Sequence, residues 1–180
     1  MADLRSVIDA YYQRVGQINR QMRSAHLSDL VTLAEALNDL ATLKRKYFTA
    51  GNGIAAFLAD YMAADLVLHG RKGISISNTA VVTGIAASKG FHAGFANQLF
   101  ILADEGDALI VFSFTGEEVN LNMAVQGAKK NGLLTIAFTP AASNTLSEAA
   151  HFAVAIPAVD DRQNLQAHLT AVSALMETLV

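Results

Sequence analysis

The chain has 180 residues, of which 52% are hydrophobic and 16% are charged, and its formal net charge is −3 at pH 7. This composition excludes a disordered chain, which combines low hydrophobicity with high net charge, and it lacks the basic excess expected for direct contact with nucleic acid. The absence of cysteine excludes disulfides, thiolate metal ligands and a catalytic thiol. Because soluble domains carry about 25% charged residues, the shortage of charge favours a homo-oligomer with a buried interface.

The length of the chain suits one domain that spans residues 1–180. The first residues are polar and no run of 18 apolar residues occurs, so neither a signal peptide nor a membrane span is expected. A cytoplasmic protein is therefore the default interpretation.

Residues 1–46 are predicted to form a helical hairpin that serves in oligomerisation. Apolar residues recur at spacings of three and four from Leu4 to Met22, a pattern typical of an amphipathic helix. A second helix is expected to begin near Ser28, after a short link at 25–27.

The rest of the chain alternates short apolar runs with helical patterns. Strands are expected at 46–50, 73–76, 107–112, 133–138 and 152–156. Helices are expected at 54–68, 79–87, 92–103, 117–131, 143–150 and 161–180. Continuous apolar runs are typical of buried parallel strands. The alternation predicts a doubly wound α/β fold, in which a five-stranded parallel sheet forms the middle of a three-layer sandwich.

In such a sheet, ligands bind beyond the carboxyl ends of the strands, and three loops leave strand ends for helix starts. The loop at 51–55 contains two glycines, which allow close backbone approach. Ala56 stands where a dinucleotide-binding fingerprint needs a third glycine, so a plain strand-to-helix turn explains this loop as well as an anion site does. The loop at 139–144 has polar side chains but no decisive pattern.

The loop at 113–118 has the strongest candidates for ligand contact. Ser113 and Thr115 offer hydroxyl groups, but the spacing from Thr115 to Glu118 is also that of a helix capping box, which is the favoured interpretation. The carboxylates of Glu117 and Glu118 suit a helix N-terminus and would repel a phosphate.

Taken in order, these segments resemble the sugar isomerase (SIS) domain, and within it the type that includes phosphoheptose isomerases and a non-catalytic DnaA initiator-associating protein. The resemblance rests on an ordered series of short motifs, Gly51-Asn-Gly53, Gly106-Asp107, Gly127 to Gly132 and Asp161-Arg162, and it covers essentially the whole chain. It implies a sugar or sugar-phosphate ligand bound at a subunit interface of a homotetramer. The ligand-binding residues that it implies are Asn52, Gly53, Ser113, Thr115, Glu118, Asp161, Gln166 and His168.

The chain departs from the family at the positions that carry its chemistry. The family's acid–base pair is a glutamate on the helix after the glycine loop and a histidine on the last helix, and these positions read Asp65 and Ser173. A further family histidine, a metal ligand in some members, reads Tyr61. Asp65 is therefore the remaining candidate for a catalytic base. No metal and no cofactor are expected, although zinc occurs in the family.

The resemblance also implies a phosphate cradle of hydroxyl groups, which is reduced here. Ala55, Phe114 and Glu118 stand at hydroxyl positions of the family. We therefore predict a protein that binds a sugar or sugar phosphate and whose isomerase chemistry is lost or altered. One alternative is an active isomerase of sedoheptulose 7-phosphate that uses Asp65 as its base. The other is a non-catalytic oligomeric scaffold or regulator that binds a protein partner.

Overall fold

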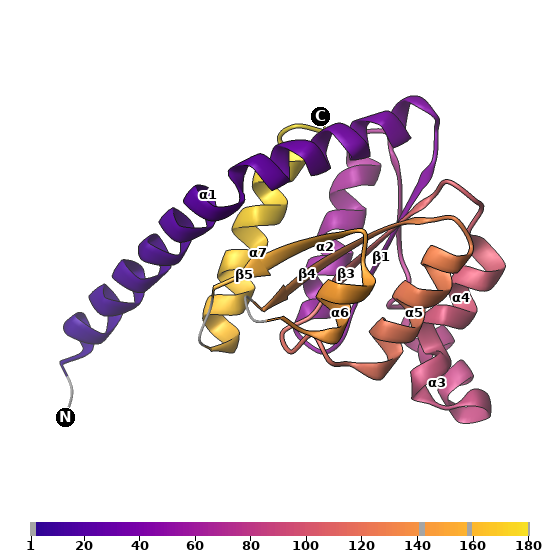
Figure 1. Ribbon diagram of the computed structural model, residues 1–180. Helices are drawn as coiled ribbons and strands as arrows, with labels where there is room; N and C mark the ends of the chain where they lie inside the picture. Colours follow the sequence, from indigo (N-terminus) through magenta and orange to yellow (C-terminus); the bar gives the residue numbers. More distant parts are fainter. Residues whose placement is uncertain (1–2, 141–142, 158–159, 180) are drawn as a thin grey trace.

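The computed structural model describes residues 3–140, 143–157 and 160–179 (Figure 1). The strands are β1 (Lys46–Gly51), β2 (Lys72–Ser75), β3 (Ala108–Phe112), β4 (Leu134–Pro140) and β5 (Phe152–Ile156). The helices are α1 (Leu4–Thr42), α2 (Ala55–Leu68), α3 (Thr79–Lys89), the short 3₁₀ helix η1 (Phe91–Ala93), α4 (Gly94–Leu102), α5 (Val119–Lys130), α6 (Thr145–Ala149) and α7 (Asp161–Met176).

The five strands form one parallel sheet in the order β2-β1-β3-β4-β5. Every residue of β3 is buried, as expected for a strand with helices on both of its faces. The predicted five-stranded parallel sheet is confirmed, and β5 has the predicted bounds.

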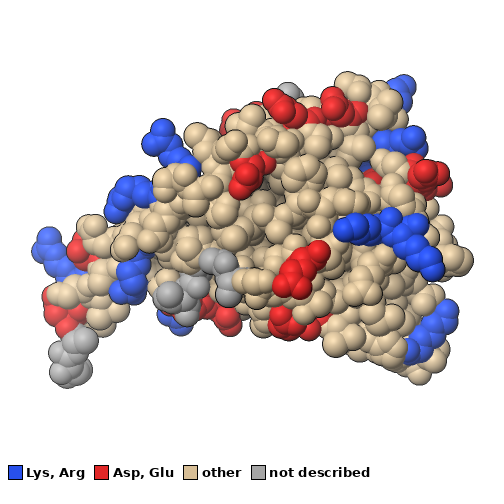
Figure 2. Space-filling view, viewed as in Figure 1, with Lys and Arg blue, Asp and Glu red and all other residues tan. Residues whose placement is uncertain are grey.

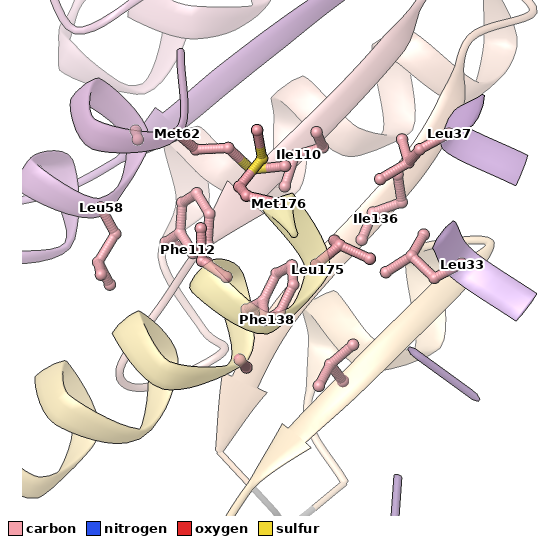
Figure 3. Packing of buried hydrophobic residues seen from close by; sticks show 14 of the residues in the cluster. Leu33, Leu37, Leu58, Met62, Ile110, Phe112, Ile136, Phe138, Leu175 and Met176 are labelled. Carbon is pink, nitrogen blue, oxygen red and sulfur yellow. The ribbon is translucent and has the colours of Figure 1, made fainter. Parts of the chain in front are cut away.

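Helices cover both faces of the sheet and make three layers. Alternate side chains of β3 enter two separate cores: Ile110 and Phe112 pack with α1, α2 and α7, whereas Leu109 and Val111 pack with α4, α5 and α6. Figure 3 shows the first core, where Phe112 and Phe138 lie between residues of α2 and α7. This sandwich brings the starts of α2, α5, α6 and α7 to the carboxyl edge of the sheet.

The helical hairpin predicted for residues 1–46 is wrong, because α1 is a single helix of 39 residues. The expected link at 25–27 reads Ala-His-Leu, with neither glycine nor proline to end a helix. His26 and Asp29 also pair across one helical turn, with 3.4 Å between Nδ1 and a carboxylate oxygen. The C-terminal half of α1 packs against α7, and the N-terminal half extends away from the sheet (Figure 1).

Several helix bounds differ from the sequence prediction. The helix predicted at 117–131 begins only at Val119, because Glu118 has an extended backbone and is the N-cap residue. The helix predicted at 92–103 is preceded by η1, and α7 ends at Met176. Within the described ranges, no helix has both the length and the hydropathy that a membrane span requires.

Candidate functional site

Two loops at the carboxyl edge of the sheet lie side by side, because β1 and β3 are neighbours with Gly51 opposite Phe112. The side chains of Asn52 and Asn120 exchange two hydrogen bonds of 2.9 Å across these loops. Asn120 is a residue that the sequence prediction missed. Asn120 could have been found from its place on the inner face of a helix start, because a buried amide there needs a hydrogen-bond partner.

Ser113 organises the loop that follows β3. Its side chain is fully buried, and its Oγ accepts the backbone N–H groups of Thr115 at 3.2 Å and Gly116 at 2.6 Å. The Ser113 hydroxyl donates to the Glu118 carboxylate, which only accepts hydrogen bonds when it is ionised. The structure therefore brings Asn52, Ser113 and Glu118 to one edge of the sheet, with Glu118 turned toward Ser113.

The capping box predicted between Thr115 and Glu118 is wrong. The Thr115 Oγ1 accepts the backbone N–H of Glu117 at 3.1 Å, and the Glu118 side chain makes no capping hydrogen bond. Gly116 has a φ of 78° and turns the chain before the helix. A Cβ at this position would lie 2.2 Å from the Cγ of Asn144, so the turn requires glycine.

Glu117 faces away from this arrangement and holds the start of α6. Its carboxylate accepts the hydroxyl of Thr145 and, at 3.0 Å, the backbone N–H of the same residue. These hydrogen bonds, the hydroxyl first, hold the pKa of Glu117 below its ordinary value. The two neighbouring glutamates therefore have different partners, and only Glu118 is directed at Ser113.

Asp65 lies apart from these loops, on the surface where α2 meets α7. It is one turn beyond Tyr61, whose hydroxyl lies 3.3 Å from the Oγ of Ser173. The Asp65 carboxylate is 3.5 Å from the Nδ1 of His69. At 1.5 Å per residue, Asp65 is about 15 Å along α2 from Ala55, where the helix begins. One protomer therefore does not bring Asp65 to its own Ser113 loop.

Tyr61, Asp65 and Ser173, with His69 beside Asp65, do not fit zinc. Protein zinc sites are built from several histidine nitrogens, cysteine sulfurs and carboxylates, whereas these residues offer two hydroxyls, one carboxylate and one imidazole. Among the residues that the structure describes, no three His, Cys, Asp or Glu side chains gather in a way that could hold a metal ion.

His168 is a core residue in the protomer. Its side chain is fully buried, its ring lies 5.1 Å from that of Phe114 and 6.4 Å from that of Phe112, and its Nδ1 is 2.8 Å from the carbonyl oxygen of Asn164. Its Nε2 is buried and has no hydrogen-bond partner among the described residues, and its predicted ligand contact stays a prediction. Within the protomer, its ring packs against those of Phe112 and Phe114.

Asp161 and Gln166 lie in the first two turns of α7. Both side chains are exposed, and Gln166 lines a groove of about 480 Å³ with Tyr11 and Tyr12 of α1. No hydrogen bond or ion pair within the described ranges joins either residue to residues 113–118. Their assignment to the ligand site stays a prediction.

Burial of His168 predicts that the protein loses stability in acid. Burial lowers the pKa of His168 below the ordinary 6.5, so the folded protein keeps the ring neutral while the unfolded chain binds a proton. Stability is then full above about pH 6.5 and falls below it, by at most about 1.4 kcal/mol per pH unit. Urea unfolding of the wild type and of His168→Phe between about pH 8 and pH 5 measures this slope.

The substitution His168→Phe should flatten that slope. His151→Gln is the control: the pKa of His151 is also lowered, first by desolvation and then by Lys129, but its side chain is far more exposed. If His168→Phe has the same pH dependence of the free energy of unfolding as the wild type, the ring of His168 does not gain a proton on unfolding.

Comparison with known proteins decides the family, since the SIS domain family matches residues 42–179. The chain belongs to the SIS domain family. A phosphoheptose isomerase of Thermodesulfovibrio yellowstonii is 29% identical to this SIS domain protein over 173 residues, which are 92% of this chain and 86% of the relative. A phosphoheptose isomerase of a Nitratiruptor species is 31% identical over 133 residues, 70% and 71% of the two chains.

Solved structures show the same fold. A phosphoheptose isomerase from Francisella tularensis superimposes on the SIS domain protein with a TM-score of 0.92 at 22% identity, over 98% of both chains. The Vibrio vulnificus NanR protein, in complex with ManNAc-6P, superimposes with a TM-score of 0.72 at 16% identity over 99% of this chain and 62% of that one. The predicted SIS fold of the phosphoheptose isomerase type is confirmed.

Proposed function

We propose that this SIS domain protein binds a sugar or sugar-phosphate-like ligand and does not interconvert aldose and ketose. The hydrogen bond between Tyr61 and Ser173 carries the proposal. Isomerisation through an enediol moves one proton between C1 and C2 and another between the two oxygens, so a base at the carbons needs a second acid–base group at the oxygens. By the resemblance, Tyr61 and Ser173 stand at positions of family histidines. Among the described residues, the hydroxyl of each is hydrogen-bonded only to the hydroxyl of the other. Asp65 alone does not supply both proton transfers.

The carboxyl edge of the sheet supports the ligand class. Asn52, Ser113, Thr115 and Glu118 place amide, hydroxyl and carboxylate groups there, the groups that bind sugar hydroxyls. The relatives are named phosphoheptose isomerases, and the NanR structure holds a sugar phosphate on the same fold. These likenesses favour a ligand from the sugars and sugar phosphates.

A site shared between two copies explains the distance from Asp65 to the protomer's own Ser113 loop. We propose a homotetramer in which α1 and α7 form interfaces and residues 1–180 act as one unit. Leu4, Ile8 and Tyr12 on the extended half of α1 expose 77%, 59% and 70% of their surface. In Figure 2, most of the surface between the extended half of α1 and the other end of the molecule is uncharged, with a few Asp and Glu side chains on it. A second copy of the chain would cover such a surface.

Binding predicts a rise in melting temperature with sedoheptulose, with its 7-phosphate or with a related sugar phosphate. A ligand at about 100 times its Kd stabilises the folded state by about 2.7 kcal/mol, and each kcal/mol raises the melting temperature of a chain of this size by about 2–4 °C. Thermal unfolding with each sugar measures the shift. Asn52→Ala, which breaks the pair with Asn120, should reduce it.

The control variant is Asn131→Ala, an exposed asparagine at the opposite end of α5, which should keep the shift of the wild type. No shift with any of the sugars would refute the proposed ligand class. Equal shifts in Asn52→Ala and Asn131→Ala would place the ligand elsewhere.

A further inference from the structure

The loop between β3 and α5 uses its own oxygen atoms to occupy its hydrogen-bond donors. The backbone N–H groups of Thr115 and Gly116 donate to the hydroxyl of Ser113, and that of Glu117 donates to the hydroxyl of Thr115. The Ser113 proton goes to Glu118. Such a loop can bind an anion when its N–H and O–H groups are free to donate. Here the three backbone N–H groups and the Ser113 hydroxyl already donate to oxygen atoms of the loop itself.

The negative charge at this place comes from the protein. Glu118 is the N-cap residue of α5, a helix of 12 residues, and a helix N-terminus carries a partial positive charge of about half an elementary unit. The Glu118 carboxylate accepts the hydroxyl of the fully buried Ser113 in the loop that leads into this helix start. The protein's own carboxylate thus occupies the Ser113 hydroxyl that an anion entering the loop would otherwise engage.

Among the described residues, no Lys, Arg or His side chain forms an ion pair with the Glu118 carboxylate. Glu117 next to it is bound to Thr145 and directed at α6. A doubly charged phosphate entering the loop would therefore meet one uncompensated negative charge at short range, which is repulsive.

We propose that Glu118 is a specificity-determining residue that excludes a phosphate group from the loop at 113–118. The ligand at this end of the site is then a sugar that presents hydroxyl or ammonium groups to the carboxylate. The proposal rests on the proposed function, because it assigns one end of the same sugar site.

Two substitutions open the loop in different ways. Glu118→Gln removes the charge and keeps the size of the side chain, and Glu118→Ser also removes the bulk and adds a hydroxyl donor. Calorimetric titration with sedoheptulose and with sedoheptulose 7-phosphate gives two dissociation constants for each protein. We expect the wild type to prefer the sugar without phosphate, and both variants to shift the ratio of the two constants toward the phosphate by at least about tenfold.

Glu117→Gln is the matched control. It removes one negative charge, as Glu118→Gln does, but from the neighbouring residue. The ratio of the two dissociation constants should stay within about twofold of that of the wild type. Binding of both sugars with an unchanged ratio in the Glu118 variants, or a wild type that prefers the 7-phosphate, overturns the role of Glu118 and leaves the proposed function standing. Absence of binding by every protein overturns the proposed function itself.

Inorganic phosphate tests the loop without any sugar. Crystals of Glu118→Ser soaked in phosphate should hold the ion against Ser113 and the start of α5, while crystals of the wild type soaked in the same way should not. A phosphate at this position in both crystals, or in neither, contradicts the proposal. Melting temperatures and circular dichroism of the variants establish that each is folded.

Discussion

Charged substitutions on the extended half of α1 are expected to dissociate the assembly. In the double variant Ile8→Glu, Tyr12→Glu, two largely exposed apolar side chains become carboxylates on one helical face. Covering a large apolar side chain contributes about 1.5–3 kcal/mol, and burying an unpaired charge costs more than that gain. In a two-fold symmetric interface both copies contribute the same residues, so each interface receives four new carboxylates. Light scattering after gel filtration should show a tetramer for the wild type and smaller species for the variant.

The matched control places the same two charges on the other side of the same helix. Gln13 and Gln17 are exposed, and at 100° per residue they lie roughly opposite Ile8 and Tyr12. Gln13→Glu, Gln17→Glu should keep the tetramer. A wild type that is a monomer at all concentrations would contradict the shared site, and dissociation by both double variants would point to a charge effect without a specific interface.

The second large effect concerns catalysis: turnover of sedoheptulose 7-phosphate should not exceed that of buffer. A positioned general acid or base contributes about 10²–10⁴-fold to a proton transfer, and the pair needs both members. Among the described residues, the hydrogen-bond partner of the Ser173 hydroxyl is the hydroxyl of Tyr61 and not an imidazole or a carboxylate that could activate it. An assay for the aldose product measures the rate in the wild type, in Asp65→Ala and in Asp60→Ala.

Asp60 is the control carboxylate. It lies on the same helix and accepts a hydrogen bond from the hydroxyl of Ser75. Turnover that disappears in Asp65→Ala and persists in Asp60→Ala would establish Asp65 as the base of an active isomerase. Turnover that neither substitution changes would place the chemistry on other residues.

The sheet was predictable because its strands are continuous apolar runs between helical patterns, and such runs have few other stable placements. The sequence did not predict that α1 is one continuous helix. Apolar spacing resumes on both sides of residues 25–27, and Ser28 and Asp29 are residues that also begin helices. The absence of glycine and proline in the link was the stronger signal, since a helix without a stop continues.

The sequence predicted which residues of the site follow neighbouring strand ends. Neighbouring parallel strands place Asn52 and Ser113 at one edge, whatever the loops do in detail. The side-chain directions depend on packing that sequence spacing does not encode. Gly116 with its positive φ turns Glu118 toward Ser113, and three phenylalanine rings enclose His168.

Hydrogen exchange at the sugar carbons tests the central claim most directly, because an isomerase removes a carbon-bound proton even when little product accumulates. Sedoheptulose 7-phosphate and the unphosphorylated sugar would each be incubated with the protein in D₂O, at concentrations where binding is seen, and examined by NMR. Retention of all carbon-bound hydrogen, at the rate of buffer alone, is the predicted result for a protein that binds without isomerising. Deuterium at C1 or C2 that Asp65→Ala abolishes would contradict it.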